Sequence, residues 1–383
     1  MAAKSRRKAS SFADKPLAIV AAGGTGGHMF PAEALARELI DRGWEVVLAS
    51  DSRGAAYAEK FPAKERLSLE AATFKTGDPI GMVRAGFKIA QGVLQARAAF
   101  KRLKPWAVIG FGGYPSFPAL TAALMRKDVT LIHEQNSVLG RSNRKLAAKV
   151  DAVACAFPVL RLAPTELEGK VQVVGNPVRP DIRALYDQPF PPVDKILTLL
   201  VTGGSQGAKI LSETVPQALA LLPVSLRIKL KVEQQTRAEQ VELAKKIYAD
   251  AEIDAEIAPF FNDMADRLGR AHLVIGRAGA STVCELAVAG KPSLLIPLKI
   301  AADDHQTYNA EVLREAKAAV VIKEEEVTAE RLSAEIRELI EAAGLLPMRA
   351  AAARSVARPD AARQLADLVE RTVSSVTGKT AKE

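Results

Sequence analysis

The stretch LAIVAAGGTGGHMFPAEALARELIDRGWEVVLAS, residues 17–50, decides the fold. It opens with residues 17–22, a short apolar run of the kind found in buried parallel strands. A glycine-rich turn and a helical stretch follow, Gly43 ends that helix, and residues 44–49 begin a second strand. The order strand, glycine turn, helix, strand predicts a βαβ unit within a parallel sheet.

The same order returns in the second half of the chain. ILTLLVTGGSQGAKILSETVPQALALL, residues 196–222, predicts a strand, a glycine turn and a helix, and residues 227–234 predict the next strand. Further apolar runs alternate with helical stretches in both halves, so the sequence predicts two doubly wound α/β domains. These additional strands are expected at residues 106–113, 129–136, 152–157, 272–279 and 292–298.

The length of 383 residues also favours two domains, because one hydrophobic core seldom serves so long a chain. The proline-rich stretch at residues 175–195 ends one pattern before the other begins. The expected parts are a disordered basic tail at 1–14, a first domain at 15–177, a second domain at 178–357, and a C-terminal helix and tail at 358–383 that packs back on the first domain.

The cysteines and the longest apolar run indicate the cellular compartment in which the protein works. Cys155 and Cys284 lie far apart, which suggests neither a disulfide framework nor a metal site and favours a reducing cytosol. The longest uncharged run, residues 106–125, contains three glycines and two prolines, so it predicts strand, loop and helix rather than a membrane span. The N-terminal tail lacks the apolar core of a signal peptide.

Charge is concentrated in the first half. The chain carries a net charge of +9, with +11 in residues 1–176 and −2 in the remainder. Residues 75–104 hold seven basic side chains and one acid, and an apolar stripe recurs there at helical spacing. Such a segment either docks on anionic lipid or is an ordinary surface helix with its stripe in the core. Nucleic acid is not expected, because no binding motif is present and aromatic residues make up 5%. The stripe consists of Val83, Phe87, Ala90 and Leu94.

Three glycine turns share one physical property. The turns at residues 23–28, 110–116 and 203–208 follow predicted strands and can present backbone N–H groups to a phosphate. Tight packing of a strand on a helix would also require glycine there. A nicotinamide dehydrogenase is the remote alternative, with Asp51 at the place of a ribose-binding acid, but GGTGGH does not match the order G-x-G-x-x-G.

A fourth unit, GRAGASTVCE at residues 276–285, has more specific chemistry. Ser281 and Thr282 would lie at a helix N-terminus, where hydroxyl and N–H groups can bind phosphate. Glu285 lies one turn further on and could accept hydrogen bonds from two ribose hydroxyls. The alternative is a simple helix cap, in which Glu285 interacts with the helix dipole.

Taken together, the motifs resemble those of the MurG family of glycosyltransferases. The resemblance covers the chain apart from its tails, and the motifs occur in the family's order. It implies a GT-B fold of two facing Rossmann-like domains, with the donor UDP-N-acetylglucosamine (UDP-GlcNAc) held mainly by the second. The motifs are GGTGGHMFPA, GFGGYPSFPA, HEQNSVLGRSNR, GNPVR, GGSQGA, FFNDM, GRAGASTVCE and DDHQTYNA.

The resemblance also implies site residues. Gly112, Gly113 and Tyr114 would help to hold the lipid-linked diphosphate of the acceptor. Many family members have an aliphatic residue in place of Phe261. A backbone contact to uracil would survive that change, whereas a side-chain contact would depend on the residue type. Arg179 suits phosphate, although a salt bridge in the domain linker would explain it too. The implied donor contacts are Thr25, Gly26, Gly27, Asn136, Arg179, Ser205, Phe261, Ala280, Ser281, Thr282, Glu285 and Gln306.

The resemblance implies an inverting sugar transfer, which needs a base for the acceptor hydroxyl and stabilisation of the leaving diphosphate. His28 is the first candidate for the base, because the positive end of a helix dipole favours neutral imidazole. Glu134 is the rival, and each residue could instead only orient its neighbours. No bound metal or other tightly held cofactor is expected, since no D-x-D pattern lies beside a sugar site and Asp303 and Asp304 are adjacent.

The function that the resemblance implies is transfer of N-acetylglucosamine to the 4-hydroxyl of the N-acetylmuramic acid unit of lipid I, giving lipid II. The expected partners are UDP-GlcNAc, lipid I and an anionic membrane surface, with a peripheral location at the cytoplasmic face of the inner membrane. A related GT-B enzyme, either another lipid glycosyltransferase or a UDP-sugar epimerase, is the alternative.

Overall fold

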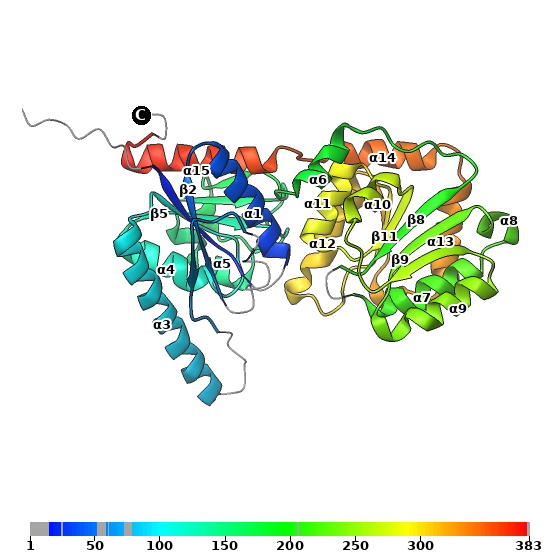
Figure 1. Cartoon of the computed structure of the whole chain (residues 1–383), viewed down its shortest axis with the longest axis horizontal. Coiled ribbons are helices and arrows are strands. Elements are labelled where there is room, and N and C mark those ends of the chain that lie inside the picture. Colours follow the sequence, from blue (N-terminus) through cyan, green and yellow to red (C-terminus); the bar gives the residue numbers. More distant parts are fainter. Residues whose placement is uncertain are drawn as a thin grey trace, which may run out of the picture.

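The computed structural model describes residues 15–23, 26–51, 59, 61–72, 79–204 and 207–380. Two parallel sheets, each flanked by helices on both faces, lie side by side in the chain (Figure 1). None of the helices within these ranges is long and apolar enough to cross a membrane.

The first sheet has seven strands in the order β3-β2-β1-β4-β5-β6-β7. Its strands are β1 (Leu17–Ala21), β2 (Glu45–Ser50), β3 (Glu65–Ser68), β4 (Ala107–Gly110), β5 (Val129–Glu134), β6 (Ala152–Cys155) and β7 (Val171–Val173). The helices among them are α1 (Gly26–Asp41), α3 (Pro79–Leu103), α4 (Ser116–Arg126) and α5 (Arg141–Leu146), with 3-10 helices at Ala147–Lys149 and Thr165–Leu167.

The second sheet has six strands in the order β10-β9-β8-β11-β12-β13. They are β8 (Leu197–Thr202), β9 (Leu230–Gln235), β10 (Asp254–Ala258), β11 (Leu273–Gly276), β12 (Ser293–Leu295) and β13 (Ala319–Val321). The longer helices are α7 (Lys209–Ala220), α9 (Val241–Asp250), α10 (Met264–Arg270), α11 (Ala280–Ala289), α12 (His305–Glu315), α13 (Ala329–Glu341), α14 (Leu345–Ser355) and α15 (Ala361–Thr377). Shorter ones are α6 (Pro180–Arg183), α8 (Val224–Arg227) and the 3-10 turns Ala184–Asp187, Ala238–Gln240, Ala302–Asp304 and Glu324–Glu326.

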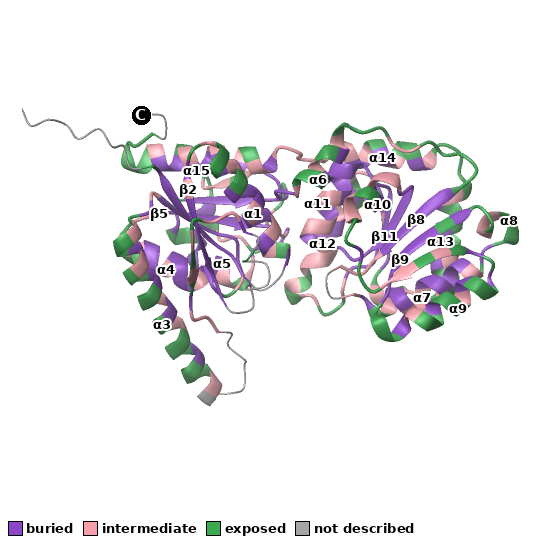
Figure 2. Ribbon diagram, viewed as in Figure 1, coloured by how far each residue is buried: buried purple, intermediate pink, exposed green. Residues whose placement is uncertain are grey.

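Strand β1 shows how the apolar runs are used. All five of its residues are buried, and alternate side chains point to opposite faces of the sheet. Ala18 and Val20 pack in one core cluster with residues of α1 and α15, whereas Ile19 packs in the other with residues of α3 and α4. A strand covered on both faces can bury every side chain, which is why it is a continuous apolar run rather than an alternating one (Figure 2).

Both sheets reverse their strand order beside the first strand of each half. In the first sheet the reversal lies between β1 and β4, and in the second between β8 and β11. Ligands of open parallel sheets bind outside the carboxyl ends of the strands at such a reversal. The four glycine turns singled out in the sequence follow these four strands, so the topology gathers them in pairs.

Helix α15 lies against the first sheet although it follows the second domain in sequence (Figure 1). Its apolar face, including Leu365 and Val369, joins the same core cluster as α1. Arg42, the residue after α1, forms ion pairs with Asp367 and Glu370 of α15, at 2.7 and 2.8 Å. The chain therefore crosses between the two sheets twice.

Helix α3 leaves its apolar stripe exposed to solvent. Val83 is 74% exposed and Phe87 is 77% exposed, and Ala90 and Leu94 are exposed as well. The buried face of α3 is formed by small residues and one aromatic, Ala85, Gly92, Ala96 and Phe100. The interpretation that placed the stripe in the core is wrong, because the helix packs on α4 and the adjoining core cluster through its other face.

Candidate functional site

Three turns of the first domain converge on His28, which lies in the first turn of α1. A Cβ on Gly112, in the turn after β4, would come within 3.1 Å of the His28 Cε1 atom. Gly112 and Gly113 have positive φ angles of 83° and 73°, and a Cβ on Gly113 would lie 2.6 Å from the Gly23 carbonyl oxygen. These glycines are therefore required by close backbone packing and left-handed geometry, whether or not a phosphate binds there.

The end of β5 supplies the polar partner of His28. The His28 Nδ1 atom lies 3.1 Å from Oε1 of Gln135. The Gln135 Nε2 atom in turn lies 3.0 Å from Nδ1 of His133, whose Nε2 is 2.9 Å from the Gly175 carbonyl oxygen. Burial lowers the pKa of His133 to about 4, so this histidine is neutral.

Glu134, the rival candidate for the base, is surrounded by hydrogen-bond donors. Its Oε1 accepts from the backbone N–H and the side-chain amide of Asn136, at 3.0 and 3.2 Å. Its Oε2 accepts from the Gly140 N–H at 2.9 Å and from the Asn143 side chain at 2.8 Å. A carboxylate bound to four donors is suited to shaping the loop after β5, and this arrangement favours the orienting role over proton abstraction.

Asn309 of α12 joins the carboxyl ends of the two sheets. Its buried Oδ1 accepts from the Ser137 N–H at 2.8 Å. Its Nδ2 donates to the Asn136 side chain at 3.1 Å and to the Ala278 carbonyl oxygen, beyond β11, at 3.2 Å. Asn136, an implied donor contact, is thus held between Glu134 and the second domain.

The start of α11 carries the residues expected at the nucleotide. Ala280 is buried, and Ser281 and Thr282 are partly exposed in its first turn. The Glu285 carboxyl, 20% exposed, lies one turn further along, and Arg179 Nε approaches its Oε1 to 3.9 Å. Burial raises the pKa of Glu285 to about 7, although the Arg179 charge acts in the opposite direction.

Arg179 links the two domains as well. Its guanidinium lies 5.3 Å from the centre of the Phe30 ring in α1. The contact with Glu285 is a loose ion pair without a hydrogen bond, and the buried Arg179 Nε has no hydrogen-bond partner. The side chain is thus not committed to a closed salt bridge in the linker, and its unused donor suits an anionic ligand.

Gln306 at the start of α12 has its amide oxygen engaged. This Oε1 accepts from the Leu298 N–H at 3.0 Å and from the Ala278 N–H at 3.3 Å. The amide nitrogen is then the group of this side chain that is left to bind the sugar, by donating to one of its oxygens. The preceding Asp303 and Asp304 both have left-handed φ angles, of 52° and 53°, and Asp303 bonds to Arg144 of the first domain at 2.9 Å. Asp303 is therefore a contact between domains rather than part of a solvated loop.

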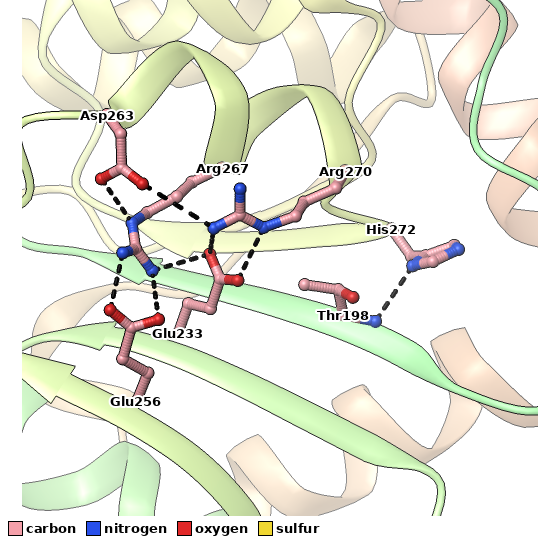
Figure 3. A network of polar contacts seen from close by, with 7 residues as sticks. All are labelled: Thr198, Glu233, Glu256, Asp263, Arg267, Arg270 and His272. Atoms are coloured by element: carbon pink, nitrogen blue, oxygen red, sulfur yellow. Dashed lines mark hydrogen bonds and ion pairs between the residues drawn. The ribbon is translucent and has the colours of Figure 1, made fainter.

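Phe261 is 5% exposed, and the Arg267 guanidinium stacks on its ring at 3.7 Å. Arg267 also pairs with Glu233, Glu256 and Asp263, in a network completed by a bidentate contact between Arg270 and Glu233 (Figure 3). Because the ring is buried under this guanidinium, the backbone is the part of Phe261 that is left to contact a base. The arginine that covers Phe261 is thus itself held by three carboxylates.

Some of the expected residues lie outside the described residues, namely Thr25, Ser205, the basic tail at 1–14, and Lys75 and Asp78 of the basic segment. Gly26 and Gly27 begin α1, and Tyr114 is exposed beside Gly113. Gly207, from the glycine turn after β8, lines a hollow of about 360 Å³ with Gln235 and Pro259. Within the described ranges, no three acidic, histidine or cysteine side chains gather as they would around a metal ion.

Sequence reasoning missed several polar residues of the site. Gln135, Asn143 and Asn309 are buried and make the contacts described above, and both side-chain atoms of the buried Asn176 lack a hydrogen-bond partner. All four residues lie within the motifs that carry the family resemblance, so their positions could have been noticed in the sequence. The roles of Gln135, Asn309 and Asn176 could not be interpreted, because their partners are far away in sequence or absent. Asn143, by contrast, bonds to Glu134 within the same motif.

Comparison with known proteins agrees with this geometry. The N-terminal domain model of glycosyltransferase family 28 matches residues 18–155, and the C-terminal domain model matches residues 198–365. A protein of Caulobacter vibrioides strain NA1000, named UDP-N-acetylglucosamine–N-acetylmuramyl-(pentapeptide) pyrophosphoryl-undecaprenol N-acetylglucosamine transferase, is 59% identical over 93% of this chain and 99% of its own length. A protein of the same name from Phenylobacterium zucineum is 57% identical over 93% of this chain and 98% of its own.

Solved structures give the same result. The crystal structure of Acinetobacter baumannii MurG is 34% identical, covers 94% of this chain and 100% of its own, and has a TM-score of 0.76. A putative UDP-N-acetylglucosamine 2-epimerase of Listeria monocytogenes, 15% identical over 97% of this chain and 99% of its own, has a TM-score of 0.66 and shares the fold alone. The predicted GT-B fold is confirmed. The chain belongs to glycosyltransferase family 28.

Proposed function

We propose that the chain transfers N-acetylglucosamine from UDP-GlcNAc to the 4-hydroxyl of the N-acetylmuramic acid unit of lipid I, the undecaprenyl-diphosphate-linked N-acetylmuramyl-pentapeptide, to give lipid II. The observation that carries this proposal is the identity of 59% with a transferase of that name along nearly the whole of both chains. The arrangement of the two glycine-turn regions, one in each domain, supports it.

In the proposed reaction His28 is the general base. The acceptor hydroxyl gives its proton to the imidazole while its oxygen attacks the anomeric carbon from the face opposite the leaving UDP. Inversion at that carbon converts an α-linked donor to a β-1,4 product. His28 is favoured over Glu134 because that carboxylate already accepts four hydrogen bonds.

The second domain is proposed to hold the donor. The N-terminus of α11, with Ser281 and Thr282, would face the diphosphate, and Arg179 would add a cation there. Glu285 would accept from the ribose hydroxyls, and the amide nitrogen of Gln306 would donate to the sugar. Such neutral donors and fixed charges can stabilise the leaving diphosphate without a tightly bound metal or other cofactor.

A transfer assay with labelled UDP-GlcNAc and lipid I in detergent tests this function. We expect labelled lipid II, release of UDP only when lipid I is present, and a fall of kcat by about 10²–10⁴-fold in His28→Ala. UDP release or epimerised sugar without lipid I would instead support an epimerase. A His28→Ala variant within a few-fold of wild type would refute the base. Activity lost in a chelator and restored by magnesium would refute the metal-free mechanism.

We further propose that α3 docks the first domain on an anionic membrane, as expected for a peripheral enzyme at the cytoplasmic face of the inner membrane. The exposed Val83 and Phe87 would enter the interface, and the exposed Arg84 and Lys88 on the same part of the helix would face lipid headgroups. This helix projects from the first domain in Figure 1. The lipid-linked acceptor would then be reached by the same domain that carries His28.

Vesicle co-sedimentation tests the docking proposal. Vesicles with anionic lipid should bind the protein, and added salt should weaken this binding, because each basic residue near such a surface contributes about 1 kcal/mol. Arg84→Glu and Phe87→Ser should each reduce binding, whereas the matched changes Lys246→Glu and Leu243→Ser, at exposed positions of α9, should not. Equal binding by the α3 and α9 variants would refute the assignment of the surface.

A further inference from the structure

A continuous chain of hydrogen bonds ends at the proposed base. It starts at the Gly175 carbonyl oxygen, passes through both ring nitrogens of His133 and the side-chain amide of Gln135, and reaches the Nδ1 atom of His28. The three successive contacts measure 2.9, 3.0 and 3.1 Å. The proposed function requires a base at His28 but leaves open which ring nitrogen of that histidine carries the proton.

The direction of the chain is set by two carbonyl groups, which can only accept. The Gly175 oxygen obliges Nε2 of His133 to donate. The amide nitrogen of Gln135 lies 3.0 Å from the main-chain oxygen of His133, so this end of the amide must be the NH₂ group. It therefore also donates to Nδ1 of His133, and the Gln135 amide oxygen faces His28.

The opposite direction is physically unfavourable. It would place the Gln135 oxygen against the main-chain oxygen of His133, and it would require both nitrogens of His133 to carry protons. The imidazolium form is disfavoured because His133 is fully buried, with its ring 5.2 Å from that of Phe111 and its pKa lowered by burial. Only the neutral ring with its proton on Nε2 satisfies every contact.

We propose that Gln135 and His133 are positioning residues that hold His28 as the tautomer with its proton on Nδ1, which leaves the lone pair of Nε2 free to accept the proton of the acceptor hydroxyl. This inference rests on the proposed function of His28. In the reaction, the hydroxyl proton moves to Nε2, the hydroxyl oxygen forms the new bond to the anomeric carbon, and the bond from that carbon to UDP breaks with its electron pair leaving on the diphosphate. The resulting imidazolium keeps its Nδ1–H bond to the Gln135 oxygen.

The surrounding backbone holds both ends of the chain. A Cβ on Gly112 would come within 3.1 Å of the His28 ring, so this ring is confined by the turn after β4. Gly175 has a φ of 91°, and a Cβ there would lie 2.7 Å from Cβ of Arg358, just before α15. The terminal carbonyl is thereby fixed against the segment that returns to the first domain. A base oriented in this way needs no rearrangement when the acceptor arrives.

The tautomer can be read directly, without any activity measurement. The protein contains four histidines, and ¹⁵N labelling of histidine alone allows each ring to be followed by two-bond ¹H–¹⁵N correlation. The spectrum is recorded at about pH 8, above the ordinary histidine pKa of about 6.5. We expect His28 to show a protonated Nδ1 and a bare Nε2. His133 should show the reverse pattern, and so should His272, whose Nδ1 accepts from the Thr198 N–H and whose Nε2 donates to the Pro192 oxygen. Single His→Gln variants assign the signals.

Substitutions of the residues in the hydrogen-bond chain test how that chain affects the reaction. Gln135→Met should abolish the Nδ1–H preference of His28 and lower kcat by about 10- to 100-fold, the loss found when the hydrogen-bond partner that orients a metal-binding histidine is removed. The KM for UDP-GlcNAc should stay unchanged. His133→Asn, which keeps an acceptor for Gln135, should retain more activity than His133→Leu. Gln234→Met, the same change at a buried strand position of the second domain, serves as the control and should keep the wild-type kcat.

The outcomes separate this inference from the proposed function. A protonated Nε2 on His28 in the wild-type spectrum would overturn the inference, whatever the kinetics show. A Gln135→Met enzyme with wild-type kcat and an unchanged His28 spectrum would overturn it too. If His28→Ala kept full activity while the spectrum showed the expected tautomer, the base assignment would fall, and with it the catalytic role of the chain, whereas the hydrogen-bond chain itself would stand.

Discussion

Lowering the pH from about 8 to about 6 should weaken the binding of UDP-GlcNAc through Glu285. In the free protein, burial raises the pKa of this carboxyl to about 7. The ionised form is the better acceptor for two ribose hydroxyls, so bound donor should lower the pKa again, and binding should release a proton near neutrality. Affinity is therefore retained above the free-protein pKa and lost as the pH falls through it.

The size of the effect follows from the ionised fraction. With a pKa of about 7, roughly 90% of Glu285 is ionised at pH 8 and roughly 10% at pH 6, so the Kd should rise by up to about ninefold, or about 1.3 kcal/mol. UDP-GlcNAc is the proper ligand, because the terminal phosphate of UDP titrates near pH 6 itself. Isothermal titration calorimetry in buffers of different ionisation enthalpy gives both the Kd and the number of protons released.

Glu285→Gln is the decisive control. This variant should bind more weakly than wild type at pH 8, and its Kd should not change between pH 6 and 8. The control is needed because burial also lowers the pKa of Lys291 to about 7. If the wild-type Kd is flat over this range, or if Glu285→Gln keeps the same pH dependence, the assigned role of the carboxylate is refuted.

Two further predictions concern ion pairs. Arg267→Met should lower the free energy of unfolding by up to about 3 kcal/mol, because it leaves Glu233, whose side chain is 1% exposed, with Arg270 as its remaining guanidinium partner. Arg37→Met, in an exposed pair, should cost less than about 1 kcal/mol. Urea denaturation measures both, and equal effects would contradict the argument from burial. Arg144→Gln removes the contact with Asp303 and should raise the KM for UDP-GlcNAc by about two- to fivefold, as expected for a partly exposed pair of about 0.5–1 kcal/mol. Steady-state kinetics tests this, and a change in the KM for lipid I alone would count against it.

The local pattern of apolar runs, glycine turns and helical stretches was sufficient to predict the fold. Runs such as 17–22 and 196–202 indicated buried parallel strands, since a strand covered on both faces has no need of polar residues. Strand limits were less well predicted: the expected strand at 227–234 begins at Leu230, because α8 occupies the residues before it. Element limits depend on competing contacts, which a short window of sequence does not contain.

The candidate site was predictable in its positions and less so in its roles. His28 and Glu285 were singled out from their places after glycine turns, and Glu134 from its place at the end of an apolar run. Whether a carboxylate acts as a base depends on how many donors surround it, and the four donors of Glu134 come from three other residues. Likewise, the raised pKa of Glu285 results from burial, which no spacing in the sequence reveals.

By itself, the sequence determined the two parallel sheets, the glycine turns at their carboxyl ends and the charge asymmetry between the halves, because each depends on residues close together in the chain. Only the tertiary structure decided that the stripe of α3 faces solvent, that the Phe261 ring is covered by Arg267, and that His28 lies at the end of a hydrogen-bond chain from Gly175 through His133 and Gln135. The last of these spans 147 residues of sequence, from 28 to 175. Hydrogen-bond direction is a property of atoms brought together by folding, so it is set only when all the partners are in place.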